Sequence, residues 1–364
     1  MEDYKIKIER IHRFLEENHY DALVLGRRDN FSWLTGGQEG GVVLSQEQSF
    51  VDLVITGEKN LAVSMRADGR KALEEQLRAM EFELVQVDWK SSGKEGYIEE
   101  ILKGKAYVSD IPLNGAAFDP EAIYQLEYPM TDAEVKRYRE LGEITEVILS
   151  ETAKKLKPGM TENDLKKEFL KLCAEYEVEV EVLLLGSDER IGRYRHCTPT
   201  DKTIRRTVLL SPVLRKYGLH SNTARMFCLG KADEELKEKY EIVSRIQAEI
   251  IGASKEGICF REIFALQEQL YQRFGCEEEW MVHGHGAPVG YMLSDGGVLY
   301  HQERKMQKNQ AYEWFVTITG AKSAELVMNV EGKQEVLSVT GKWPVKEYLT
   351  EKGNRILLPE ILEL

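Results

Sequence analysis

Three histidines of this chain stand in settings that suit proton transfer. His196 lies in "RYRHCTPTD" beside two arginines, and His283 and His285 lie in "MVHGHGAPVGY". Imidazole is the side chain best able to move protons near neutral pH. The glycines around His283 and His285 leave these rings little local cover, which favours a pocket or a loop over a core. For His196 a second interpretation stays open, a turn histidine hydrogen-bonded to backbone.

Three arginines and two aromatic residues are candidates for holding a substrate. Arg193, Arg195 and Arg225 can grip an anionic group through paired hydrogen bonds. Arg225 has an alternative structural role, tying its hairpin to neighbouring elements. Tyr291 and Trp314 can wall a pocket, although aromatic residues at such positions are also common in cores.

One segment of the chain is free of acidic residues. No aspartate or glutamate lies between Lys202 and Lys231, although the 364-residue chain carries 62 of them. The same segment holds seven basic residues: Lys202, Arg205, Arg206, Arg215, Lys216, Arg225 and Lys231. It also contains Ser211, in "LLSPVL". A nucleophilic role for this serine requires a base within hydrogen-bond reach.

Composition excludes several classes of protein. The formal charge of −13 argues against nucleic acid or an anionic membrane as a partner. The charged start "MEDYKIKIERIHRFL" does not resemble a signal peptide, and no apolar run is long enough to span a membrane. The five cysteines form no CxxC pair and no zinc spacing, so we expect reduced thiols in a cytoplasmic protein. The length favours two domains.

The first part of the chain alternates strand and helix patterns. A helical rhythm in "IKIERIHRFL" leads into a buried-strand pattern, and "SFVDLVITGEKNLAVSM" reads as two strands joined by a turn. The segment "DGRKALEEQLRAM" is helical in pattern. Further strands are expected at 22–25, 83–87 and 106–108. The pattern predicts a small α/β domain over residues 1–128, ending at Tyr128-Pro129, where proline disfavours helix in the residue before it.

The second part, residues 129–364, mixes long helices with antiparallel strands. Thr131 or Asp132 is the expected N-cap of the first helix, and Thr161 caps the second. Two more helices are expected at 232–256 and 261–274, the latter closed by Gly275. Strands are expected at 180–185, 207–213, 221–228, 311–319 and 325–330. We therefore predict an α+β domain.

Several motifs, in register, resemble one known family. "DALVLGRRDNFSWLTGG" is similar to the amino-terminal domain of aminopeptidase P, prolidase and creatinase. "TDAEVKRYRELGEITEVI…KPGMTENDL" is similar to the first two helices of their pita-bread domain. "YGLHSNTARMFCLG" resembles that family's hairpin at Gly218, Ser221 and Arg225, "MVHGHGAPVGY" its His-Gly segment, and "SAELVMNVEGKQEVLS" its closing hairpin. The resemblance implies an α/β domain followed by an α+β pita-bread domain.

The resemblance also implies where metal ligands would fall. Peptidases of the family hold two divalent metals with two aspartates, one histidine and two glutamates. These positions correspond here to Ser211, Asn222, Ala287, about Phe315 (within one residue) and Glu325. A gapped alternative puts the histidine on His285. Only Glu325 retains a ligand type, so the sequence predicts a degenerate site with no metal and no other cofactor.

For catalysis, the resemblance to creatinase implies hydrolysis of a C–N bond without a metal, since creatinase catalyses such a reaction in this fold. His196 and His283 resemble family histidines that face the reacting group, and Glu325 would act as base or orienter. A solvated strand position is the alternative for Glu325. His285, Tyr291, Trp314 and the arginines are the expected substrate contacts.

Three functions are therefore carried forward from the sequence. The leading one is a metal-independent hydrolase or lyase acting on a C–N bond of a small, anionic metabolite. The alternatives are a metal-dependent Xaa-Pro dipeptidase or aminopeptidase, and a non-catalytic ligand- or protein-binding module. Relatives lead us to expect a homodimer, with a small-molecule substrate and with neither nucleic acid nor membrane as a partner.

Overall fold

The computed structural model describes residues 2–364, which form two compact units, residues 1–134 and 135–364. The expected boundary after Tyr128 lies six residues before this division. The difference arises because the first turn of helix α6 (Asp132–Lys155) belongs with the first unit: Lys7 Nζ lies 2.7 Å from Glu134 Oε1. Thr131 is the N-cap of α6, since the Glu134 amide and carboxylate bond its hydroxyl and its amide respectively.

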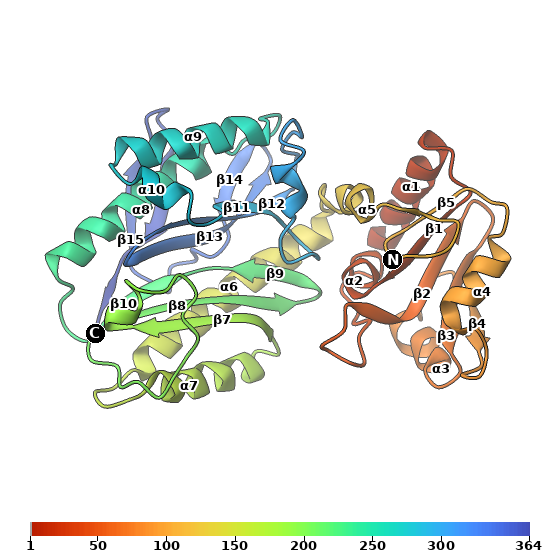
Figure 1. Cartoon of the computed structure of the whole chain (residues 1–364), viewed down its shortest axis with the longest axis horizontal. Coiled ribbons are helices and arrows are strands. Elements are labelled where there is room, and N and C mark those ends of the chain that lie inside the picture. Colours follow the sequence, from red (N-terminus) through yellow and green to blue (C-terminus); the bar gives the residue numbers. More distant parts are fainter. Residues whose placement is uncertain (1) are drawn as a thin grey trace. The chain divides into compact units, whose positions relative to one another are not determined.

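The first unit is an α/β domain built on one mixed sheet (Figure 1). The sheet order is β4-β3-β2-β1-β5-β6, and β1 pairs antiparallel with β2 and parallel with β5. The strands are β1 (Ala22–Arg27), β2 (Gln48–Thr56), β3 (Asn60–Met65), β4 (Glu83–Val87), β5 (Tyr107–Ser109) and β6 (Ala117–Phe118). The helices are α1 (Glu2–Glu17), α2 (Arg28–Leu34), α3 (Gly69–Lys71), α4 (Gly93–Ile101) and α5 (Pro120–Glu127), with a π-helical turn at Ala72–Gln76.

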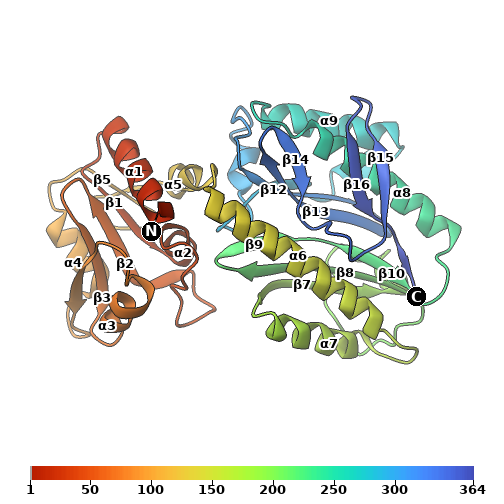
Figure 2. The ribbon, with the colours of Figure 1, turned by 180° about the vertical axis from the view of Figure 1, so that it is seen from behind.

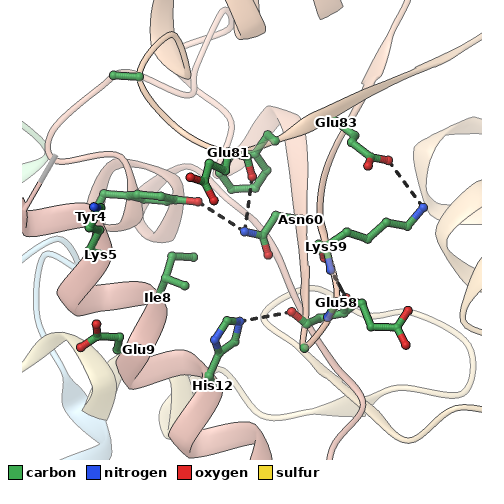
Figure 3. A pocket seen from close by; sticks show the side chains of 14 residues that line it. Tyr4, Lys5, Ile8, Glu9, His12, Glu58, Lys59, Asn60, Glu81 and Glu83 are labelled. Atoms are coloured by element: carbon green, nitrogen blue, oxygen red, sulfur yellow. Dashed lines mark hydrogen bonds and ion pairs between the residues drawn. The ribbon is translucent and has the colours of Figure 1, made fainter.

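A cavity of about 630 Å³ lies between α1 and the β2–β3 turn (Figure 3). Its polar groups are bound to one another: His12 Nε2 lies 3.2 Å from the Thr56 carbonyl, and Asn60 Nδ2 lies 3.4 Å from the Tyr4 hydroxyl. Lys59 and Glu83 form an exposed ion pair across the same cavity. The cavity contains none of the residues singled out for chemistry.

The second unit is an α+β domain with two main sheets. One has the order β17-β10-β8-β7, with β9 also on β8, and the other has the order β11-β12-β13-β14. The strands are β7 (Glu179–Ser187), β8 (Thr207–Lys216), β9 (Leu219–Asn222), β10 (Arg225–Cys228), β11 (Gly286–Val289), β12 (Ala311–Ile318), β13 (Ala321–Val330), β14 (Lys333–Val336), β15 (Val345–Leu349), β16 (Arg355–Pro359) and β17 (Leu362–Glu363).

Helices cover the two sheets on their outer sides. Figure 2 shows α6 and α7 (Glu162–Glu175) lying over the sheet that contains β7 and β8. Helix α8 (Glu234–Ala253) packs on β12 and β13, and α9 (Phe260–Arg273) packs on α8, followed by the short α10 (Glu277–Trp280). Two 3₁₀ turns lie at Asp188–Arg190 and Gly296–Leu299. Trp314, Val316, Ile250 and Phe260 are among the buried residues of this core.

The fold class predicted from the sequence is confirmed in both units. The long amphipathic helices were placed to within a few residues because their period is unambiguous. No helix among residues 2–364 combines the length and apolar composition that crossing a bilayer requires.

Candidate active site

The centre of the second unit holds a buried lysine bound to a serine. Lys322 Nζ, from β13, lies 2.9 Å from Ser211 Oγ, from β8. Lys322 is 6% exposed and Ser211 1% exposed. A buried ammonium is costly unless it is bound. Among residues 2–364, however, no carboxylate comes within ion-pair distance of Lys322, and the serine hydroxyl is its close polar partner.

The pairing register of β12 and β13 decides which of their side chains lie on the same face as Lys322. Phe315 pairs with Ala324 and Thr317 with Lys322, whereas Trp314 pairs with Glu325. Because successive side chains point to opposite faces of a sheet, Phe315, Ala324 and Lys322 share one face. Glu325 projects from the other face.

A buried carboxylate lies on the same face as Lys322. Asn222 Nδ2, on β9, donates to Glu313 Oε2 at 2.8 Å. Burial raises the pKa of Glu313 to about 7, although hydrogen bonds from Ser294 and Asn222 and the charge of Lys322 oppose that shift. Burial lowers the pKa of Lys322 to about 8, opposed by Glu313. We call Ser211, Asn222, Glu313, Phe315 and Lys322 the central cluster.

Two of the predicted histidines meet beside the central cluster. His196 Nε2 and His283 Nε2 lie 2.9 Å apart, and their ring centroids are separated by 4.9 Å at an interplanar angle of 76°. His283 Nδ1 bonds the Gly284 carbonyl, which can only accept, so this nitrogen carries the proton. In the neutral ring Nε2 is then the acceptor, and His196 Nε2 donates to it. The second nitrogen of His196, Nδ1, is thereby left as a free acceptor.

Phe315 connects the histidine pair to the lysine. Its ring packs edge-on against His283 at 5.3 Å between centroids, and Lys322 Nζ lies 5.5 Å from its centroid. Burial lowers the pKa of His196 and, with smaller contributions, so do the positive charges of Lys322 and Arg195. The pKa of His283 is also lowered, first by burial, while the Gly284 bond opposes the shift and Lys322 adds to it. Both rings are therefore neutral at pH 7.

A cavity of about 280 Å³ lies beside the segments that carry the two histidines. It is lined by their sequence neighbours, Arg195 and Val282, and by Arg193, Glu278 and Glu279, but not by either histidine. Arg195 forms an ion pair with Glu279, which also accepts the Thr319 amide at 3.0 Å. The guanidinium of Arg193 has no side-chain partner among residues 2–364. Arg193 is therefore the arginine of this cavity without an ion-pair partner among residues 2–364, although Glu278 also lines the cavity.

Two residues predicted for the site belong to a separate buried network. Arg225 Nη1 donates to Glu325 Oε1 at 2.8 Å, and Ser338 Oγ donates to Glu325 Oε2 at 2.5 Å. Arg225 also donates to the Ser338 carbonyl at 2.7 Å. Burial raises the pKa of Glu325 to about 7, and Arg225 opposes this. The structure does not bring Glu325 to the histidines, and Arg225 ties its hairpin to neighbouring elements rather than facing a substrate.

Three further residues that were predicted to contact the substrate, His285, Trp314 and Tyr291, are buried. His285 Nε2 bonds the Trp280 carbonyl at 2.9 Å and its Nδ1 lies 3.1 Å from the Tyr271 hydroxyl, so neither nitrogen is available to a metal. Burial lowers the pKa of His285 to about 4. Trp314 is fully buried and stacked on Tyr312, and Tyr291 is also fully buried. Their predicted role as pocket walls is not what the structure shows, because strand alternation directs Trp314 into the core.

The acid-free segment does not create a free basic patch. Lys202 pairs with Asp188 at 2.6 Å, and Arg215 with Glu179 at 2.7 Å, in each case with an acid outside the segment. Arg225 is bound by Glu325 in the same way.

Sequence reasoning missed Lys322 and Glu313. The available signal was the presence of charged residues in two otherwise largely apolar strands: Glu313 alone in "AYEWFVTI", and Lys322 with Glu325 in "AKSAELVMNV". Buried strand positions rarely hold a charge unless it has a partner.

Comparison with known proteins decides the family. The profile of metallopeptidase family M24 matches residues 136–324, more than half of the chain. The chain belongs to metallopeptidase family M24. The Xaa-Pro dipeptidase of Pyrococcus horikoshii is 24% identical over 293 residues, which is 78% of this chain and 81% of the relative.

Solved structures show the same fold. The prolidase of Pyrococcus horikoshii OT3 superposes with a TM-score of 0.75 at 18% identity, covering 92% of this chain and 98% of that one. The dipeptidase PepE of Mycobacterium ulcerans superposes with a TM-score of 0.76 at 16% identity, covering 93% and 96%. The creatinase, aminopeptidase P and prolidase resemblance is thus confirmed.

The donor set of this M24 chain does not fit the two metals that the family implies. The implied ligand positions present a hydroxyl, an amide, a methyl and a phenyl group at Ser211, Asn222, Ala287 and Phe315. Ala287 lies opposite Glu313, on the face of the central cluster. Lys322 adds a positive charge that repels a dication. Within residues 2–364 no three His, Cys, Asp or Glu side chains gather as a metal site.

Proposed function

We propose that this M24 chain is a metal-independent hydrolase or lyase acting on a C–N bond of a small, anionic metabolite. The observation that carries the proposal is the 2.9 Å hydrogen bond between His196 and His283, beside a cluster whose cation is a lysine. A pair of neutral imidazoles can take up and pass on a proton at neutral pH. Glu325 has no part in this version of the mechanism.

The general base in this proposal is Nδ1 of His196. This nitrogen is free to accept a proton from an attacking hydroxyl group or water, while Nε2 holds His283. Proton transfer of this kind contributes roughly 10²–10⁴-fold to a rate. His283, fixed by the Gly284 carbonyl, orients the His196 ring and shares the charge that develops.

Arg193 and the size of the cavity support a small anionic substrate. About 280 Å³ lies at the low end of ligand pockets and suits a metabolite rather than a peptide chain. Arg193, which has no ion-pair partner among residues 2–364, offers its guanidinium to a substrate carboxylate there, in the bidentate geometry that arginine favours. Arg195 is already neutralised by Glu279.

In its protonated form, which is the major one at pH 7 for a pKa of about 8, Lys322 supplies the positive charge that a metal would otherwise give. A fixed cation in a buried site stabilises negative charge that develops on a carbonyl oxygen as the C–N bond is attacked. Its hydrogen bond to Ser211 holds the ammonium in place. No step of the proposed reaction therefore needs a metal.

The test is turnover by metal-free protein. Protein treated with EDTA and desalted is incubated with a panel of carboxylate-bearing amides, ureido acids, guanidino acids and Xaa-Pro dipeptides, and amine release is followed by mass spectrometry. We expect release to persist in EDTA and to fall at least about 100-fold in His196→Ala, but not in His12→Ala, a histidine of the first unit. Release that appears only with added manganese or cobalt would return the chain to the metal-dependent Xaa-Pro peptidases.

A second candidate is a non-catalytic binding module. The observation that favours it is the closure of the central cluster, because Lys322 and Ser211 are almost wholly buried. In that case the panel gives no amine release while a ligand bound in the cavity is recovered unchanged. This outcome would contradict the proposed hydrolase activity and support a binding function.

Two further predictions belong to the same proposal. We expect a homodimer, which light scattering at several concentrations checks, and a cytoplasmic location, which fractionation of the source cell checks. A monomer at all concentrations, or recovery outside the cytoplasm, would contradict the respective expectation.

A further inference from the structure

We infer that Ser211 and Lys322 form a nucleophile–base dyad that transfers the acyl group of a small amide or ester through a covalent serine intermediate. The inference rests on the proposed metal-independent hydrolase and gives it a specific chemistry. Serine is a weak nucleophile until a base within hydrogen-bond reach removes its proton. The sequence offered no such base near Ser211, and the structure supplies one.

The geometry of the pair is that of a nucleophile and its base. Lys322 Nζ lies 2.9 Å from Ser211 Oγ, within the reach that proton transfer requires. The two residues come from β8 and β13, strands of two different sheets, so their approach depends on the packed core rather than on a flexible loop. Pro212 follows Ser211 and favours the extended backbone that Ser211 adopts in β8.

The surroundings of Lys322 favour loss of its proton. No carboxylate among residues 2–364 is ion-paired with it, although the Phe315 ring, 5.5 Å from Nζ, favours the charged form. Burial lowers the pKa of Lys322 to about 8, with Glu313 opposing. A lysine in this state is neutral in a useful fraction of molecules near neutral pH, and a neutral amine accepts the serine proton.

The reaction balances without a co-reactant other than water. Ser211 Oγ attacks the carbonyl carbon as its proton passes to Lys322 Nζ. The C–N bond breaks, the leaving nitrogen takes that proton from Lys322, and an ester to Ser211 remains. Water then attacks the ester, gives one proton to the same lysine, and releases the carboxylic acid as Ser211 Oγ is reprotonated.

Phe315 separates this dyad from the histidine pair. Its ring contacts both His283 and Lys322, and it is only partly buried. Ser211 is 1% exposed, so the dyad requires the Phe315 ring to rotate aside before a carbonyl can reach the serine. Removing the ring should open the path without touching either reacting atom.

The test is covalent labelling, which needs no knowledge of the substrate. The full-length chain is incubated with a small fluorophosphonate and analysed by intact mass and peptide mapping. We expect one label per chain, on the peptide containing Ser211, and faster labelling of Phe315→Ala. Ser211→Ala and Lys322→Met should lose about 100-fold or more of the labelling rate. Lys322→Arg should lose it too, because arginine keeps the charge but does not accept a proton.

The matched control is Ser323→Ala, a buried serine next to Lys322 on the opposite face of β13, which should label like wild type. Thermal melts of all variants show that each is folded. Absence of a Ser211 adduct in both wild type and Phe315→Ala would overturn the dyad, as would equal labelling of Ser211→Ala. Metal-free turnover that survives in Ser211→Ala would overturn the dyad and leave the proposed hydrolase standing, with His196 activating water directly. Turnover that depends on added metal would instead defeat the proposed function.

Discussion

Glu313 and Lys322 lie on one face of adjacent strands, a buried carboxylate and a buried ammonium that influence each other without forming an ion pair. Each has a close neutral partner, Asn222 for the carboxylate and Ser211 for the ammonium. In an M24 fold this places charged protein groups beside two of the positions where the family resemblance implies metal ligands, Asn222 and Ser211. The centre of the chain is therefore a polar network of side chains with a chemistry of its own.

Replacing Lys322 should change the titration of both paired histidines. Its positive charge lowers the pKa of His196 and of His283, so Lys322→Met should raise both values. Histidine titration followed by NMR measures this. Unchanged values for the pair would mean that Lys322 does not act on the histidines.

The free energy of unfolding should depend on pH through the titration of Glu313. Its pKa is raised from 4.5 to about 7, so the folded chain holds a proton that the unfolded chain has released between these values. The contribution of this carboxyl to the free energy of unfolding is therefore greatest below pH 4.5 and is lost as the pH rises through 7. Relative to Glu313→Gln, wild type should lose stability on the order of 3 kcal/mol across that window.

Urea unfolding of the two proteins at several pH values measures this difference. Glu268→Gln, which replaces an exposed glutamate on α9, is the control and should show a difference close to zero throughout. A difference between wild type and Glu313→Gln that stays constant from pH 4.5 to 7 would show that Glu313 titrates normally.

Glu325 and Arg225 should prove structural. Removing either partner of a buried pair leaves a charge without compensation, so Glu325→Gln and Arg225→Met should each cost about 3–5 kcal/mol of stability. Arg139→Met, which breaks the exposed pair with Glu335, should cost under about 1 kcal/mol. Turnover per folded molecule should be retained in Glu325→Gln. A folded, equally stable Glu325→Gln that has lost turnover would restore the role first predicted for it.

Much of the fold could be predicted because its long elements carry clear signals. The capping threonines at 131 and 161 mark the helix starts, and the period of apolar residues marks their faces. The short strands β15 to β17 and helices α2 and α5 were not predicted, since a few residues show no reliable period. The chain also crosses the boundary between its units inside a helix, where composition does not change.

The site was predicted only in part because the pairing register of β12 and β13 decides which side chains of these strands face it. His196 and His283 could be singled out, since histidines flanked by arginine or glycine stand out along the sequence. Whether Glu325 or its neighbour Ala324 faces Ser211 depends on a one-residue register, and "YEWFVTIT" offers no proline to fix it. Gly286, at a φ of 124°, further interrupts the alternation beside His285. Which side chains face Ser211 therefore depends on pairing between strands, which the local sequence does not determine.

The most direct test of the central claim is metal content. The protein is incubated with manganese and with cobalt, desalted, and analysed by plasma mass spectrometry. Because four of the five implied ligand positions hold uncharged side chains and Lys322 places a positive charge beside Ser211, we predict a content near zero per chain. A content near two per chain would contradict this account and identify the protein as a metal-dependent peptidase with ligands of a different kind.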